Sequence, residues 1–162
     1  MIQMCVSSLL ARSLPSLCLF FVLTCFPIVL LAQEADTVKA LQLTAEAQRK
    51  QAAGQIDEAY DLYSKAEAIY TQVGDVDNQI EIKIQRIAVL AEKNEFDQAL
   101  KETIEGIEIA KTAGSDFSLL QIQTHLGYLY VQWGKMKDAQ VAYETAWEMA
   151  DEQQQRGHLF AI

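Results

Sequence analysis

Few side chains in this chain of 162 residues have the types and spacing that chemistry requires. The two histidines, His125 and His158, are the candidates for acid–base catalysis or for binding zinc. Neither belongs to a spaced set of histidine, cysteine and carboxylate residues that would chelate a metal, and neither has a catalytic partner within motif range. We therefore expect both histidines to serve packing or the protein surface.

The acidic residues and the glycines form no binding motif either. Short acidic stretches at 75–77 and 105–108 lack the alternating oxygen ligands and the terminal glutamate of a calcium loop. The seven glycines stand singly, so no glycine-rich loop is available to cradle a phosphate. We predict that the protein is not an enzyme and that it holds neither a metal ion nor another cofactor.

The charge balance narrows the class of partner. The chain has 13 basic and 22 acidic residues, which gives a formal net charge of -9. Binding to nucleic acid or to an anionic lipid surface depends on clustered lysine and arginine. We therefore expect no nucleic-acid partner, and contact with a membrane only through the N-terminal segment described next.

The first 32 residues are a segment of different character. No side chain from Leu14 to Ala32 is charged, and Arg12 is the only charged residue before them. A basic start, an apolar stretch and a small residue before a polar one are typical of a secretory signal, here cleaved after Ala32. A stretch of this length can also span a bilayer, so an uncleaved membrane anchor is the alternative. We predict an exported protein, periplasmic or extracellular, which is membrane-anchored if the leader is not cleaved.

The leader also contains every cysteine and every proline of the chain. These residues are Cys5, Cys18, Cys25, Pro15 and Pro27. Cleavage would leave no cysteine for a disulfide, a thiolate metal site or a nucleophile. The stability of the remaining chain would then rest on packing alone.

After the leader, residues of similar type recur every 40 positions. A turn residue is followed five positions later by alanine three times: Gly54 and Ala59, Asn94 and Ala99, Gly134 and Ala139. Between these turns, apolar and small residues recur every three or four positions, which is the helical period. Such repetition predicts stacked helical hairpins. We place three of them in one domain of residues 33–153, at about 37–76, 77–116 and 117–153.

The third unit resembles the tetratricopeptide repeat (TPR). The matching residues are Leu126, Gly127, Tyr130, Gly134, Ala139, Tyr143 and Ala146. The first unit matches through Ala47, Gly54, Ala59, Tyr63 and Ala66, and the second through Leu90, Asn94, Ala99 and Gly106. The 40-residue period resembles a subgroup with longer helices than the minimal repeat. The resemblance implies an all-α fold, a right-handed superhelical array of helical hairpins (an α-solenoid), in which small residues let paired helices approach closely.

The resemblance also implies that a segment of a partner protein binds on the concave side, which the first helix of each hairpin lines. The repeat register places ten residues there: Thr44, Gln48, Gln51, Ile84, Ala88, Ala91, Thr124, Tyr128, Val131 and Gln132. Thr44 and Gln48 stand where the family's carboxylate clamp would begin, so we expect apolar anchoring instead, with Tyr128 as the main anchor. The alternative is that Ile84, Ala88 and Val131 only pack against neighbouring helices.

Two further expectations concern the ends of the hairpins. We expect Trp133 and Trp147 to pack between helices, and a role as binding anchors is the alternative. Residues 154–162 repeat the start of a first helix, because Phe160 and Ile162 continue the 40-residue recurrence. These residues predict a truncated fourth repeat, in which case the chain is a fragment of a longer protein. The alternative is a natural chain whose last turn covers the third hairpin. An uncapped third hairpin also allows self-association.

The leading functional hypothesis is therefore an exported scaffold that binds another protein or a peptide segment in its concave groove, without catalysis. The alternative is an extracytoplasmic input domain of a larger signal-transduction protein that continues beyond Ile162.

Overall fold

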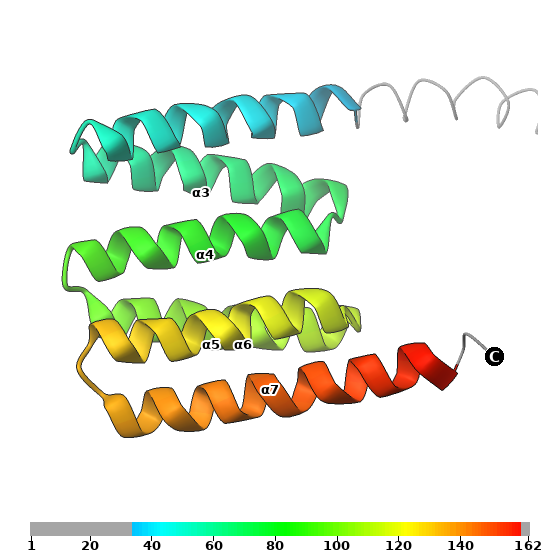
Figure 1. The fold of residues 1–162 in the computed structure, drawn as a ribbon. Helices are drawn as coiled ribbons and strands as arrows, with labels where there is room; N and C mark the ends of the chain where they lie inside the picture. Colours follow the sequence, from blue (N-terminus) through cyan, green and yellow to red (C-terminus); the bar gives the residue numbers. More distant parts are fainter. Residues whose placement is uncertain (1–33, 160–162) are drawn as a thin grey trace, which may run out of the picture. The chain divides into compact units, whose positions relative to one another are not determined.

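The computed structural model describes the backbone of residues 34–159 and the side chains of residues 34–152 (Figure 1). The predicted leader, residues 1–32, lies outside this range. The chain divides into two compact units, Met1–Asp36 and Thr37–Ile162, and the packing reported below lies within the second.

The described residues form helices joined by tight turns, with no strand among them. The first helix covers residues 34–52, and it is followed by α3 (Ile56–Val73), α4 (Val76–Glu92), α5 (Phe96–Ala113), α6 (Asp116–Gln132) and α7 (Met136–Leu159). Successive helices run back and forth beside one another (Figure 1), and α4 also packs against α6. The predicted all-α array of helical hairpins is confirmed. None of the helices within residues 34–159 has the length and apolar composition of a membrane-spanning segment.

The turns between the helices follow from residue type. Gly74 ends α3 in the left-handed conformation, with a φ of 74°. Asn94 adopts a φ of 63° between α4 and α5, and it is the only non-glycine residue with a positive φ in the described chain. Asparagine tolerates this conformation better than other residues with a Cβ. The helices that follow two of the turns begin at side-chain caps, where Asp75 accepts from the Asn78 amide and Ser115 from the Ser118 amide.

The core lies between successive helices and has two clusters of buried residues. The first joins the helix at 34–52, α3 and α4 and includes Tyr63, Tyr70 and Val89. The second joins α4, α5 and α6 and includes Ile87 and Ile122. Both clusters contain α4, which therefore lies at the centre of the packing.

The last helix is longer than the sequence predicts. The third hairpin was expected to end at residue 153, but α7 continues without a break to Leu159. Position 154 is glutamine, whereas the positions 40 and 80 residues earlier are Gly114 and Gly74, which end α5 and α3. Glutamine is a good helix former, so the stop signal is missing. The predicted fourth repeat is not tested, since residues 160–162 lie outside the described range.

Candidate binding groove

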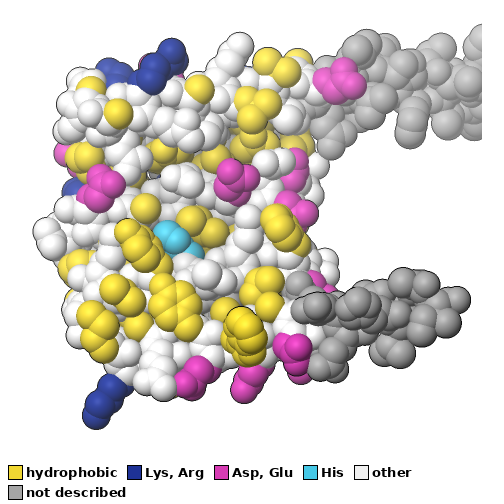
Figure 2. Space-filling model, viewed as in Figure 1, with side chains coloured by type: hydrophobic (Ala, Val, Ile, Leu, Met, Phe, Trp, Pro, Cys, Tyr) yellow, Lys and Arg dark blue, Asp and Glu magenta, His cyan; other side chains and the backbone are white. Residues whose placement is uncertain are grey.

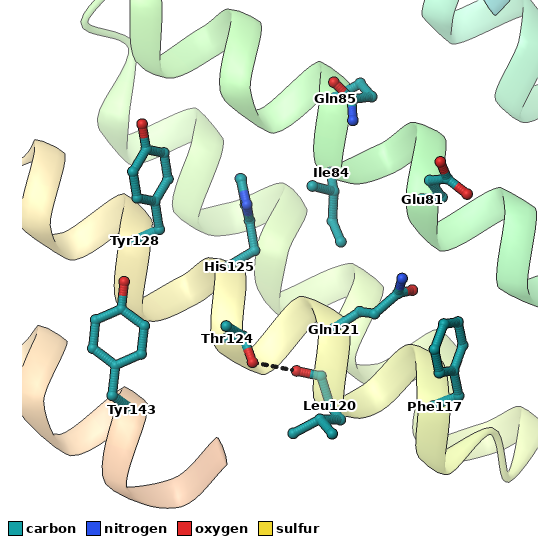
Figure 3. Close-up of a pocket in the computed structure, with 10 residues that line it drawn as sticks. All are labelled: Glu81, Ile84, Gln85, Phe117, Leu120, Gln121, Thr124, His125, Tyr128 and Tyr143. Carbon is teal, nitrogen blue, oxygen red and sulfur yellow. Dashed lines mark hydrogen bonds between the residues drawn. The ribbon is translucent and has the colours of Figure 1, made fainter. Parts of the chain in front are cut away.

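A hollow of about 660 Å³ lies over α4, α6 and α7 (Figure 3). Ten residues line it: Glu81, Ile84, Gln85, Phe117, Leu120, Gln121, Thr124, His125, Tyr128 and Tyr143. Those of α6 recur every three or four positions, so the helical period brings them to one face. Those of α4 show the same spacing, and the packing of α4 on α6 sets the two rows side by side.

The lining offers apolar contact and almost no charge. Phe117 and Tyr128 are 59% and 48% exposed, so both remain available to a ligand. Glu81 is the only charged lining residue at neutral pH, because His125 is uncharged there: burial lowers its pKa from 6.5 to about 4. Exposed aromatic rings in a weakly charged hollow favour an apolar anchor of a ligand over an ionic one.

The polar groups of the hollow are partly engaged within the protein. The Thr124 hydroxyl donates to the Leu120 carbonyl oxygen at 2.8 Å, and the Gln132 amide donates to the Tyr128 hydroxyl at 2.9 Å. The amide oxygen of Gln121, by contrast, is buried without a hydrogen-bond partner among the described residues. A buried acceptor without a partner is unfavourable.

The hollow contains three of the ten residues that the sequence placed in the groove, namely Ile84, Thr124 and Tyr128. It does not include Thr44, Gln48 or Gln51 of the helix at 34–52, nor Ala88, Ala91, Val131 or Gln132. Ala91 is buried in the core, which fits a packing role. The Gln51 amide donates to the Glu92 carboxylate at 2.6 Å and so connects the first helix to α4.

Several lining residues were not among the sequence predictions. Phe117, Gln121 and His125 precede Tyr128 at helical spacing, so extending the row from Tyr128 towards the start of α6 would have found them. Tyr143 comes from α7, and its contact with the hollow depends on how α7 packs, which residue spacing along one helix does not reveal.

The two tryptophans differ in their surroundings. The Trp133 ring stacks on Phe96 with the ring centroids 5.5 Å apart, so the expected packing of Trp133 is confirmed. Trp147 is 78% exposed on α7, so its expected packing is wrong. The reason is that no hairpin within the described residues follows α7 and covers it.

A second concentration of polar side chains ties α4 to both of its neighbours. Arg86 of α4 forms ion pairs with Glu67 of α3 and, at 3.0 Å, with Glu102 of α5. The Lys83 ammonium lies 3.2 Å from the Glu67 carboxylate. Tyr60 donates from its hydroxyl to Glu102 at 2.7 Å, and the Arg86 guanidinium also lies over the Tyr60 ring. We call these five residues the ionic cluster.

The ionic cluster is largely shielded from water. Glu67, Lys83 and Glu102 are buried, and the pKa of the Tyr60 hydroxyl is raised mainly by burial and then by the hydrogen bond to Glu102. The ionic cluster was not predicted from the sequence, because its members lie on three helices and share no motif. It contains no histidine, cysteine or serine, and no group of three potential metal ligands exists among the described residues. Its geometry suits a structural tie between the first two hairpins.

Burial of His125 makes the stability of the fold depend on pH. The pKa is about 4 in the folded protein and about 6.5 when unfolded, so the unfolded state binds the proton first. The stability that the uncharged imidazole contributes is therefore fully present above pH 6.5 and falls by about 3 kcal/mol as the pH drops to 4. His125→Phe keeps a ring beside Tyr128 but cannot be protonated. Urea unfolding at pH 7 and pH 4.5 should show a smaller loss of stability in this variant, and equal losses in both proteins would contradict the prediction.

Comparison with known proteins supports the fold. The described residues form a TPR-like array of helical hairpins. Neither a protein-family model nor a curated protein matches the chain. Among solved structures, the chain is similar to the crystal structure of the TPR domain of Arabidopsis FLU, with a TM-score of 0.60 and 13% sequence identity. The match covers 72% of this chain and 98% of that one. At this level of identity the likeness concerns the fold alone.

Proposed function

We propose that the protein is a non-catalytic scaffold that binds an extended or helical segment of another protein in the hollow over α4 and α6. The observation that carries the proposal is the lining of that hollow, where the exposed rings of Phe117 and Tyr128 flank a floor with a single charged residue, Glu81. An apolar side chain of a ligand would pack against one of the two rings. The TPR-like fold supports this role because stacked hairpins form extended concave binding surfaces.

The proposal is tested by selecting peptides and then removing one ring. Peptides from a random display library are selected on the unaltered protein, and their affinities are measured by fluorescence polarisation. Tyr128→Ala should weaken binding by about 30-fold, because truncating a central aromatic anchor costs about 2 kcal/mol. Circular dichroism should show unchanged helicity, since Tyr128 is exposed.

A matched control separates the hollow from general surface effects. Ile104→Ala shortens another exposed apolar side chain, on α5 and outside the hollow, and should leave the affinity unchanged. Selected peptides that bind the Tyr128→Ala variant as tightly as the unaltered protein would sink the proposal.

We also propose that the scaffold acts outside the cytoplasm, on the strength of the leader pattern in residues 1–32. Mass spectrometry of the exported protein should find Gln33 as the first residue. An intact leader on exported protein would favour the membrane anchor, and a protein retained in the cytoplasm would contradict export altogether. No observation on the described residues favours the alternative role as an input domain.

A further inference from the structure

The outer face of α7 differs from the same face of α3 and α5. Tyr63 of α3 and Thr103 of α5 are fully buried. The residue at this position in α7 is Tyr143, which is 39% exposed. Trp147, one turn further along, stands where α3 has the buried Glu67. The face that is buried on both α3 and α5 is therefore exposed on α7.

The outer side of α7 has a shallow hollow. We call the surface around this hollow the α7 face. The hollow has a volume of about 430 Å³ and is lined by Gln140, Tyr143, Glu144, Trp147 and Glu148. The two aromatic rings form its apolar part, and the two glutamates flank them. From Gln140 to Glu152 the chain has four acidic residues and no basic one. No described ion pair neutralises Glu144 or Glu148. Figure 2 shows hydrophobic side chains gathered over α6 and α7, with acidic ones along the edge below them.

The covered face of α3 shows which chemistry fits such a surface. The helix that lies on it, α4, contributes the apolar side chains of Ile82 and Val89 to the cluster around Tyr63. Between them in the sequence, Lys83 and Arg86 form ion pairs with Glu67 of α3. The covering helix thus combines an apolar row with two cations that pair with the one carboxylate beneath it, that of Glu67.

We propose that the α7 face docks a basic amphipathic helix of a partner protein. Its apolar row would cover Tyr143 and Trp147, and its lysine or arginine residues would pair with Glu144 and Glu148. A second copy of this chain fits less well. A twofold contact through the same face would bring these glutamates against their own copies, in a chain whose net charge is already -9.

The probe is a synthetic amphipathic peptide of the length of α4, with leucine at the apolar positions and lysine at the others. Its counterpart has glutamate in place of lysine. Trp133→Phe keeps the stacking on Phe96 and leaves Trp147 as the only tryptophan, so the fluorescence emission reports on the α7 face. We expect the lysine peptide to shift the emission to shorter wavelength and to bind at least about tenfold more tightly than the glutamate peptide at low salt.

Neutralising the acids tests the pairing directly. Glu144→Gln with Glu148→Gln should weaken binding of the lysine peptide by about three- to tenfold, since exposed ion pairs contribute little each. A control double variant, Asp61→Asn with Asp97→Asn, also removes two negative charges, from α3 and α5. It should leave binding of the lysine peptide unchanged. Equal affinities for the two peptides, or equal losses in the two double variants, would overturn the proposal.

The free protein gives a further check. The emission of Trp147 should be that of an indole in water, independent of protein concentration. A short-wavelength emission that grows with concentration would show that a second copy covers the face. A short-wavelength emission that does not change with protein concentration would show that another segment of this chain covers the face. Either result would overturn the proposal. Tyr143 also lines the hollow over α4, α6 and α7, so that hollow is tested separately, by peptide binding to the Tyr128→Ala variant.

Discussion

Replacing Gly127 with alanine is expected to destabilise the fold by about 3 kcal/mol, although alanine is the better helix former. Gly127 lies within α6 opposite Tyr143 of α7. A Cβ at this position would approach three ring atoms of Tyr143 to within 2.7–2.8 Å. An aromatic ring is rigid, so the helices must separate or the ring must leave its rotamer. The free energy of unfolding in urea, followed by circular dichroism, measures the loss.

A double variant decides whether the clash with Tyr143 is the cause. In a Tyr143→Ala background the obstructing ring is absent, so Gly127→Ala should become neutral or stabilise the helix by up to about 1 kcal/mol. If Gly127→Ala destabilises the Tyr143→Ala protein as strongly as the unaltered one, close approach of α6 to α7 is not the reason for the glycine.

Removing Arg86 is expected to destabilise the fold at least as much as Gly127→Ala. Arg86→Met leaves Glu67 and Glu102 buried with their main counter-charge gone, and such a break in a buried ion pair costs about 3–5 kcal/mol. Lys83 remains beside Glu67, which places the expected loss towards the lower end. Urea unfolding at pH 7 measures it.

Two further variants test whether buried charge is responsible. Arg86→Met combined with Glu67→Gln and Glu102→Gln removes the unpaired carboxylates and should recover most of the lost stability. Lys93→Met removes a cation from the exposed ion pairs with Asp57 and Glu95, and it should have a far smaller effect because water screens these charges. Equal losses from Arg86→Met and Lys93→Met would contradict the role assigned to the ionic cluster.

The fold could be predicted from local signals because the residues that end helices recur in each repeat. Gly54, Gly74, Gly114 and Gly134 all adopt the left-handed conformation expected of residues that end helices, and Asn94 does so at the second hairpin. The close approach at Gly127 also follows from the small residue that the TPR pattern has there. The length of α7 could not be derived from the repeat, because the glycine that ends α3 and α5 is absent at position 154.

The site was less predictable, for physical reasons. Thr124 and Tyr128 lie in the hollow with Ile84 because a helical period fixes which residues share a face. The first-helix residues Thr44 and Gln48 share the same register but do not line this hollow. The ionic cluster joins residues 16 and 19 positions apart in the sequence, and only the packing of three helices brings them together.

The ionic cluster has a consequence for cooperativity along the array. Each hairpin of such a stack contacts only its neighbours, so the strength of each junction decides which parts unfold together. The cluster and both buried apolar clusters converge on α4, which couples the first two hairpins strongly. α7 has an uncovered outer face and contributes no residue to either apolar cluster. We therefore expect local opening to begin at α7, the helix whose exposed face would gain most from a bound partner.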